Sequence, residues 1–277
     1  MANKLRIVSN NAADRATLSA TTTAGSLVVA NLQNDYKSDV YRSTATSATI
    51  TATWSATETI GMVALPFCNL TSTATIRVKL YTNTADVSPV YDTGALNAGA
   101  SVPTTAYDWG NTPLGVNSYS YVGAAYARLW FTQTPCKKME VIISDASNTS
   151  GYIEAGRLVC GAYFTPTMDA ELDVSWETID TSISERSEAS DLISSLGVRS
   201  RKMSFSLQNM TPADRLAIIN IFKSNSTTRP LFVSLFPDDA DVDQERLYQI
   251  YGKMSKTNAV TIAYWNAYAT TIEIEEA

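Results

Sequence analysis

Residues 48–54, ATITATW, alternate strictly between apolar residues and threonine. Side chains of an extended chain point alternately to opposite faces, so this segment has one apolar face and one threonine face. The apolar face consists of Ala48, Ile50, Ala52 and Trp54. A period of two predicts a half-buried β-strand, and it excludes an amphipathic helix, whose period is 3.6.

Most of the chain up to residue 164 continues in this manner. In TIRVKLYTN, the apolar residues Ile76, Val78 and Leu80 alternate with Arg77 and Lys79. Further strands are expected at 126–133 (YARLWFTQ), 137–145 (KKMEVIISD) and 152–164 (YIEAGRLVCGAYF). Short strands separated by Asn, Asp, Gly, Ser and Pro turns predict a β-sandwich.

The charge balance changes near residue 165. Up to residue 164 there are 11 Lys and Arg against 10 Asp and Glu, whereas the remainder has 10 against 17. The segment TPTMDAEL, which follows a predicted strand, carries a proline and two acids at this point. We therefore predict two domains, 1–164 and 165–277, and 277 residues are enough for each to bury a core.

The second half combines strands with one helix and one polar arm. Residues 180–196 are rich in serine and charge, and they predict an exposed arm or a long loop. Residues 211–222 predict a helix: Thr211 is a favourable N-cap, Pro212 fits the first helical position, and Leu216, Ile219 and Phe222 recur every third residue. Strands are expected around this helix, among them 230–236, which lies between two prolines, and 246–254. The fold class is thus mainly β: an N-terminal sandwich, then a smaller β-barrel or sandwich domain with one helix.

The composition excludes several classes of function. The chain has no histidine, which removes the commonest general base and the usual zinc ligand. Its three cysteines, Cys68, Cys136 and Cys160, form no C-x-x-C motif and are expected to be buried thiols. A net charge of −6 without a basic patch argues against nucleic-acid binding, and Arg199, Arg201 and Lys202 are expected at a solvated edge. The N-terminus, MANKLRIVSNN, has no apolar signal-peptide core, and the longest apolar stretches are far below the ~20 residues of a membrane helix, so we expect no membrane insertion.

The acidic segment DDADVDQE, residues 238–245, does not match a calcium-binding loop. Counted from Asp239, the position that requires glycine is Gln244 and the position that requires glutamate is Ile250. We expect an exposed turn between two strands, with a looser calcium site as the alternative. Glu171, Asp173 and Glu177 lie around Trp176, but like charges on one strand face indicate a solvated surface more than a glycosidase pair. We therefore predict no catalytic residue, no metal and no cofactor.

Aromatic residues in the segment 107–121 are the candidate binding site. Exposed aromatic rings can stack on sugar rings while neighbouring polar groups bond to the hydroxyls. The glycan-binding candidates are Tyr107, Asp108, Trp109, Asn117 and Tyr119. The alternative is that these rings cap the sandwich or fill its edge.

Two resemblances to known families follow from the order of these segments. NLQNDYKSDVYRS, with Tyr41-Arg42-Ser43, then ITATW and ETIGMVALPFCNLTSTATIRVKLYTN, is similar to discoidin-like or galactose-binding-like jelly rolls, over residues 12–164. EAGRLVCGAYFTP, NMTPADRLAII, RPLFVSLFPDD, RLYQIYGKM and IEIEEA together resemble tail-tip and baseplate proteins of long-tailed bacteriophages, over residues 153–277.

The second resemblance implies a structural virion protein with a distal-tail-like domain. Such a domain forms rings, so the expected partners are further copies of the chain and other phage tail proteins. The jelly roll would decorate the tail or contact the host surface, and the protein would be made in the host cytoplasm. A carbohydrate-binding protein for host adsorption, with host surface polysaccharide as its partner, is the alternative. A polysaccharide-degrading enzyme is the remotest one.

Overall fold

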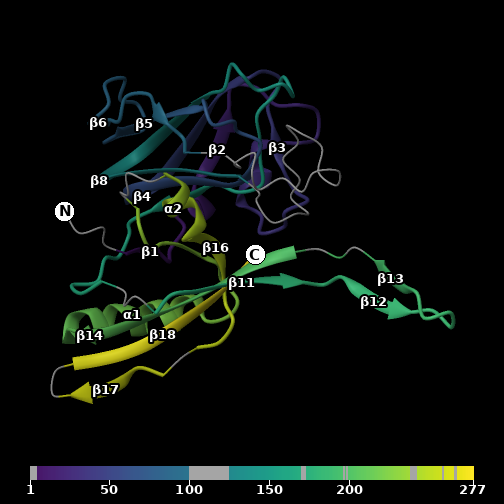
Figure 1. Cartoon of the computed structure of the whole chain (residues 1–277). Helices are drawn as coiled ribbons and strands as arrows, with labels where there is room; N and C mark the ends of the chain where they lie inside the picture. The colour runs from purple at the N-terminus through teal and green to yellow at the C-terminus, as the bar shows by residue number, and fades with distance from the viewer. Residues whose placement is uncertain are drawn as a thin grey trace.

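Two curled β-sheets make up most of the molecule. The structure is a computed structural model and describes residues 5–99, 125–169, 173–195, 197, 199–237, 242–257, 259–264 and 267–277. Figure 1 shows the two sheets stacked on one another, with a thin arm that leaves the second sheet. The expected mainly β fold is confirmed.

The larger sheet has nine strands within the described residues, in the order β3-β9-β4-β8-β5-β6, with β2 and β10 also paired to β4 and β7 to β5. Their bounds are Thr17–Ala20 (β2), Tyr41–Arg42 (β3), Ser47–Cys68 (β4), Thr75–Tyr81 (β5), Tyr91–Asp92 (β6), Leu96–Asn97 (β7), Ala125–Ser144 (β8), Glu154–Ala155 (β9) and Val159–Gly161 (β10). Two 3₁₀ helices, Ala12–Arg15 (η1) and Val29–Gln33 (η2), accompany this sheet.

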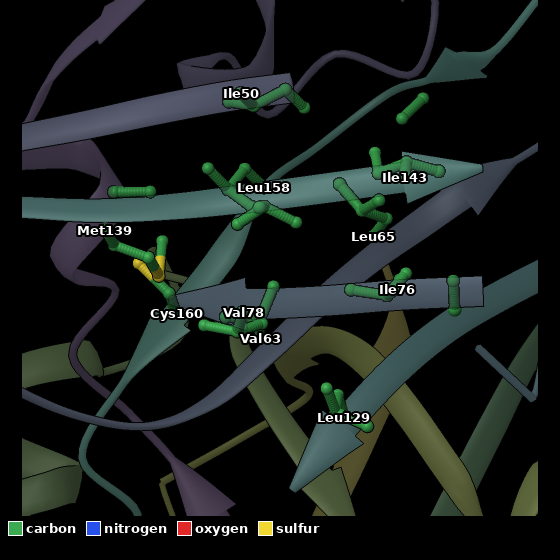
Figure 2. Packing of buried hydrophobic residues seen from close by; sticks show 14 of the residues in the cluster. Ile50, Val63, Leu65, Ile76, Val78, Leu129, Met139, Ile143, Leu158 and Cys160 are labelled. Carbon is green, nitrogen blue, oxygen red and sulfur yellow. The ribbon is translucent and has the colours of Figure 1, made fainter. Parts of the chain in front are cut away.

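The long strands β4 and β8 allow this sheet to curl around its own core. Their antiparallel pairing is interrupted three times by register shifts, which increase the twist and bend the strands. The predicted apolar face of residues 48–54 is buried, as are Ile76, Val78 and Leu80 on β5. Figure 2 shows how side chains from β4, β5, β8 and β10 meet in this core, where Val63 and Val78 lie near Cys160. All three cysteines are buried and free, as the sequence predicts.

The smaller sheet has seven strands within the described residues, in the order β1-β15-β16-β18-β14-β11, with β17 paired to β18. Their bounds are Arg6–Val8 (β1), Ser175–Asp180 (β11), Arg199–Met210 (β14), Leu231–Ser234 (β15), Gln249–Met254 (β16), Thr261–Tyr264 (β17) and Ala267–Glu276 (β18). All four residues of β15 are buried, which fits the expected interior strand between two prolines.

The N-terminal strand β1 belongs to the smaller sheet. It pairs with β15, and Ile7 also exchanges two backbone hydrogen bonds with Phe164, of 2.9 and 2.8 Å. Residues 6–8, which we expected within a 1–164 domain, therefore complete the sheet of the second half. Strands that lie so far apart in the sequence pair without any local sequence pattern from which the pairing could be predicted. The division at residue 164 stays a prediction.

Helix α1, Pro212–Asn225, packs against the smaller sheet and ends three residues later than predicted. Thr211 caps it as expected, and its side chain and that of Asp214 form a reciprocal capping box. The predicted buried stripe is wrong: Leu216 is 58% exposed and Ile219 and Phe222 are only partly buried, whereas Ile218 and Ile221 are buried. Ile218 and Ile221 lie on the side of α1 that faces the core, whereas Leu216 faces outward.

A second, short helix, α2 (Val242–Leu247), replaces the turn and strand start that we expected there. Residues 238–241 lie outside the described part of the chain, and β16 begins at Gln249 instead of Arg246. Acidic residues stabilise the first turn of a helix through its dipole, and Gln, Glu, Arg and Leu are good helix formers. The acidic composition that we interpreted as a turn therefore also fits a helix start.

The predicted polar arm is a β-hairpin. Strands β12 (Ile183–Arg186) and β13 (Leu192–Ser195) pair only with each other, and they continue outward from β11 and β14. Figure 1 shows this arm projecting away from both sheets. All eight of its strand residues are exposed.

The two sheets meet in a junction of aromatic rings and buried arginines. Phe67 of β4 packs against Tyr251 of β16, with ring centroids 6.2 Å apart, and Tyr126 of β8 against Phe232 of β15, at 6.3 Å. Around these rings lie Val8, Met62, Ala64 and Val159. A continuous apolar contact of this kind holds the sheets as one body.

Two buried ion pairs at the junction are tied to the opposite half of the molecule, one by a hydrogen bond from Tyr126 and one directly. On the smaller sheet, Arg201 donates to Glu276 at 2.6 Å, and Tyr126 of the larger sheet donates to the same carboxylate at 2.5 Å. Arg128 on β8 forms a second pair with Glu245 of α2, whose carboxylate also accepts from Trp130 at 3.2 Å. Our expectation that Arg201 lies at a solvated edge is wrong. Its side chain is buried and paired with a carboxylate 75 residues away along the chain.

The charge of Glu276 depends on Arg201. Burial is the largest single cause and raises the pKa of this carboxyl, but Arg201, Lys37 and the hydroxyl of Tyr126 together outweigh it, so the pKa lies below the usual 4.5. A depressed pKa in the folded state means that the pair contributes fully to stability above pH 4.5, and that this contribution is lost as the pH falls through the folded-state pKa.

We predict that Glu276→Gln lowers the free energy of unfolding at pH 7 by about 3–5 kcal/mol, because it leaves Arg201 buried without a counter-charge. The matched control is Glu58→Gln, which breaks the exposed pair with Arg15 and should cost about 1 kcal/mol or less. Urea unfolding followed by circular dichroism measures both. Equal losses in the two variants would contradict the role of this pair. Glu276→Gln should also flatten the loss of stability below pH 4.5.

Candidate functional site

The glycan-binding candidates from the sequence lie outside the described residues. Tyr107, Asp108, Trp109, Asn117 and Tyr119 all fall in the segment 100–124. Their role therefore stays a prediction.

The other sequence candidates do not converge on one site. Trp176 and Glu177 lie exposed on β11 at the edge of the smaller sheet, Asp173 is exposed before that strand, and Glu171 is outside the described part. Across the ranges that the structure describes, no group of three or more acidic or cysteine side chains could hold a metal ion. The helices described are also too short or too polar to cross a membrane.

A polar cleft of about 820 Å³ lies between the two halves of the molecule. One wall comes from the larger sheet and its 3₁₀ helices, and it carries Asp14, Asp35 and Arg157. The other wall comes from the C-terminal part of α1 and the loop after it, with Asn220 and Arg229. Ligand sites are frequent at such junctions between units of a fold.

Asn11 fixes the first wall in place. Its side-chain oxygen accepts from the backbone of Ala13, at 3.2 Å, and of Cys160, at 3.0 Å. Its amide donates to the carbonyl of Leu158, at 2.9 Å. The side chain thus caps η1 and ties it to β10, which sets the position of Asp14 within η1.

Arg157 organises the charges of this wall. Its side chain is only 4% exposed, and its Nη2 lies 2.8 Å from Asp14 and 3.1 Å from Asp35. Its Nε donates to the hydroxyl of Tyr251 at 3.0 Å, and that hydroxyl donates to Asp35 at 3.1 Å. One buried guanidinium therefore holds two carboxylates from separate segments at the cleft surface.

Burial and neighbouring charges both act on the titratable groups of this wall. Burial raises the pKa of Asp14 above its usual value, Arg157 opposes this rise, the nearby charge of Asp35 adds to it, and Arg15 opposes it. Burial likewise raises the pKa of the Tyr251 hydroxyl, so it stays protonated at neutral pH. Arg15 also lines this wall, so two guanidinium groups balance the two carboxylates, whose oxygens offer hydrogen-bond acceptors to the cleft.

The opposite wall offers donors. Asn225 is buried and supports this wall by donating to the carbonyls of Ser9, at 2.7 Å, and Pro230, at 3.2 Å. Asn220 and Arg229 are exposed, and their side chains have no hydrogen-bond or ion-pair partner among the residues that the structure describes. A cleft with acceptors on one wall and unpaired donors on the other can bind a partner that carries both.

One exposed aromatic residue beside the cleft escaped our sequence analysis. Tyr36 is 71% exposed and follows Asp35, which lines the cleft. It lies in the sequence NDYKSD, which has the mixture of aromatic and polar residues by which we selected 107–121. The same criterion therefore could have found it.

The arm is the second feature of functional interest. Ile183, Leu192 and Ile193 are 61–63% exposed on this two-stranded hairpin. Its turn carries charge of both signs, with Arg186 at the end of β12 and Glu188 in the turn.

Comparisons with known proteins found similarity at the level of structure alone. No family model and no curated protein matches the chain. Among solved structures, CpGH89CBM32-5 from Clostridium perfringens, in complex with GalNAc-β-1,3-galactose, is 9% identical, with a TM-score of 0.38 over 55% of this chain and 100% of that one. A Streptococcus pneumoniae fucose-binding module is 10% identical, with a TM-score of 0.37 over 55% of this chain and 94% of that one. A mutant of a chitosan-binding module from Paenibacillus sp. IK-5 is 15% identical, with a TM-score of 0.37 over 56% of this chain and 98% of that one.

We predict that Arg157→Met raises the pKa of Asp14 further, because the carboxylate loses its nearest counter-charge. Arg15→Met is the matched control, since Arg15 lowers the pKa of Asp14 less than Arg157 does. Titration of the side-chain carboxyl carbons by NMR measures both changes. A larger rise in the Arg15 variant would contradict the place of Arg157 as the organising charge of this wall.

Proposed function

We propose that this chain is a non-enzymatic structural subunit, which joins a larger assembly through its β-hairpin arm. The arm is the observation that carries the proposal. A two-stranded hairpin is at best marginally stable alone in water, and this one leaves three large apolar side chains exposed. A partner that covers the arm would stabilise the hairpin and bury these side chains.

The rigid junction between the sheets supports the same proposal. An assembly subunit must present its contacts at defined angles, and the Arg128–Glu245 pair and the hydrogen bond from Tyr126 to Glu276 hold the two halves in one orientation. An arm on one side of a subunit that binds a different surface of the next makes a head-to-tail contact. Repetition of such a contact closes a ring or extends a filament.

The finer form of the proposal is a virion protein of a phage tail tip. It draws on the resemblance of residues 153–277 to baseplate and distal-tail proteins, which form rings with further copies and with other tail proteins. In that setting the larger sheet would decorate the tail or contact the host surface.

We predict that the double variant Leu192→Ser/Ile193→Ser weakens self-association of the chain by about tenfold or more, because two exposed apolar contacts are lost. Val87→Ser is the control, since Val87 is exposed in the loop between β5 and β6, far from the arm in sequence. Sedimentation velocity over a range of concentrations measures the association. A wild-type chain that stays monomeric alone and binds no tail protein would contradict the assembly proposal.

Carbohydrate binding is the second candidate function, and the exposed ring of Tyr36 favours it. An aromatic ring among Asn34, Asp35 and Asp39 provides a stacking surface with hydrogen-bond partners beside it. The aromatic segment 107–121 provides a further candidate surface. A protein with both functions would hold a sugar-binding face on an assembled particle.

We predict that Tyr36→Ala weakens binding to host-surface oligosaccharides on a glycan array by about three- to tenfold, through loss of ring stacking. Trp109→Ala tests the aromatic segment in the same experiment. No binding of the wild-type chain to any polysaccharide would remove this function. Shortened polysaccharide chains after incubation would instead indicate an enzyme.

A further inference from the structure

We propose that the cleft between the two halves binds an acidic oligosaccharide, with a carboxylate of the sugar at Arg229 and sugar hydroxyls at Asp14 and Asp35. The inference rests on the second candidate function, carbohydrate binding, and names a site and a class of sugar for it. It follows from the size of the cleft, from the groups that are already paired in its walls and from the groups that stay free.

The cleft has the size and the lining of a site for a polar small molecule. Its volume is about 820 Å³, within the range of about 300–1,000 Å³ that ligand sites occupy. Most of its lining residues are polar, and Asn10, Gln33 and Asn220 contribute amide groups beside the charged residues. An amide both donates and accepts hydrogen bonds, as a sugar hydroxyl does, so this lining fits a hydroxyl-rich ligand.

The first wall presents carboxylate oxygens as acceptors. The side chains of Asp14 and Asp35 are 43% and 38% exposed, although both are held by the buried guanidinium of Arg157. An ionised carboxylate has about four lone-pair sites, so oxygens exposed to this extent can accept further hydrogen bonds from the cleft. Hydroxyl groups donate to such oxygens, whereas an anionic group placed against them is repelled.

Arg229 is the guanidinium of the cleft that is open to an anion. Arg157 is shared by the two carboxylates of the first wall, and Arg15 donates to Glu58, which does not line the cleft, through two bonds of 2.9 Å. Arg229 is exposed on the opposite wall and has no ion-pair partner among the residues that the structure describes. A guanidinium can bind a carboxylate through two parallel hydrogen bonds, so one acidic group on a ligand satisfies this wall.

The two walls together select one class of ligand. A ligand with several negative charges is repelled by Asp14 and Asp35, and a neutral sugar leaves the charge of Arg229 without a partner. An oligosaccharide with a single uronic acid unit fits both walls, because it carries hydroxyls on each ring and one carboxylate. Tyr36, which follows Asp35 in the sequence and is 71% exposed, offers a ring on which a neighbouring sugar unit can stack.

Paired probes test the charge preference of the full chain. The probes are oligosaccharides with one glucuronate or one galacturonate unit, each compared with its carboxyl-reduced form, in which an alcohol replaces the carboxylate. Wild type should bind the acidic member of at least one pair about tenfold more tightly than the reduced member, because only the acidic member pairs with Arg229. Isothermal titration calorimetry measures each affinity.

Arg229→Gln removes the charge and should lower this preference to about twofold or less, while binding of the reduced probe stays within about twofold of wild type. Lys223→Gln is the matched control, because Lys223 is exposed on α1, does not line the cleft and changes the charge by the same amount. The control should keep the preference of wild type. Circular dichroism checks that both variants are folded.

The outcomes separate this inference from carbohydrate binding as such. Loss of the preference in Arg229→Gln but not in Lys223→Gln supports the site. Equal binding of both members of every pair, or a preference that survives Arg229→Gln, overturns the site, whereas carbohydrate binding survives if Tyr36→Ala still weakens it. No binding of any probe overturns the site, and no binding to any polysaccharide on the glycan array overturns carbohydrate binding as well. A glutamate-rich peptide that binds more tightly than every oligosaccharide, in a manner that depends on Arg229, overturns the assignment to a sugar.

Discussion

The structure depends on guanidinium groups that are buried where the two sheets meet. A buried arginine destabilises a protein strongly unless its charge is paired. The side chains of Arg201 and Glu276 are 8% and 6% exposed, and the hydroxyl of Tyr126 joins them from the larger sheet. Arg128 depends in the same way on Glu245 of α2. Neither half of the molecule can move away without leaving a charge or a hydroxyl buried and unpaired, so these pairs fix the relative position of the sheets.

This constraint links the fold to the proposed assembly. The arm grows from strands β11 and β14, and β14 also carries Arg201. The direction of the arm therefore depends on the strand that carries Arg201, whose partner Glu276 also accepts a hydrogen bond from Tyr126 of the larger sheet. The cleft depends on the same junction, because Arg157 bonds Tyr251 of the smaller sheet while it holds Asp14 of the larger half. A molecule built in this way holds its arm and its cleft at a fixed angle to one another.

The sequence could predict the local elements but not their long-range partners. The alternation of residues 48–54 and the cap at Thr211 identify a strand and a helix, because both signals lie within a few residues. The charge of Arg201 looked like a solvated edge, since its partner Glu276 lies 75 residues later. The pairs Arg128 with Glu245 and Arg157 with Tyr251 span 117 and 94 residues. The cleft arises from such contacts, and no spacing in the sequence could have revealed it.

The buried arginines at the junction are of two kinds, which differ in whether their carboxylate partners are buried or exposed. Arg128 and Arg201 have their carboxylate partners buried with them, so their charges are compensated inside the molecule. Arg157 is equally buried, but its partners Asp14 and Asp35 are exposed at the cleft. Arg15, which lines the same wall, balances the second carboxylate, so the oxygens of Asp14 and Asp35 face the cleft as hydrogen-bond acceptors without excess charge. The same kind of side chain that closes the junction therefore also positions polar groups in the cleft between the two halves.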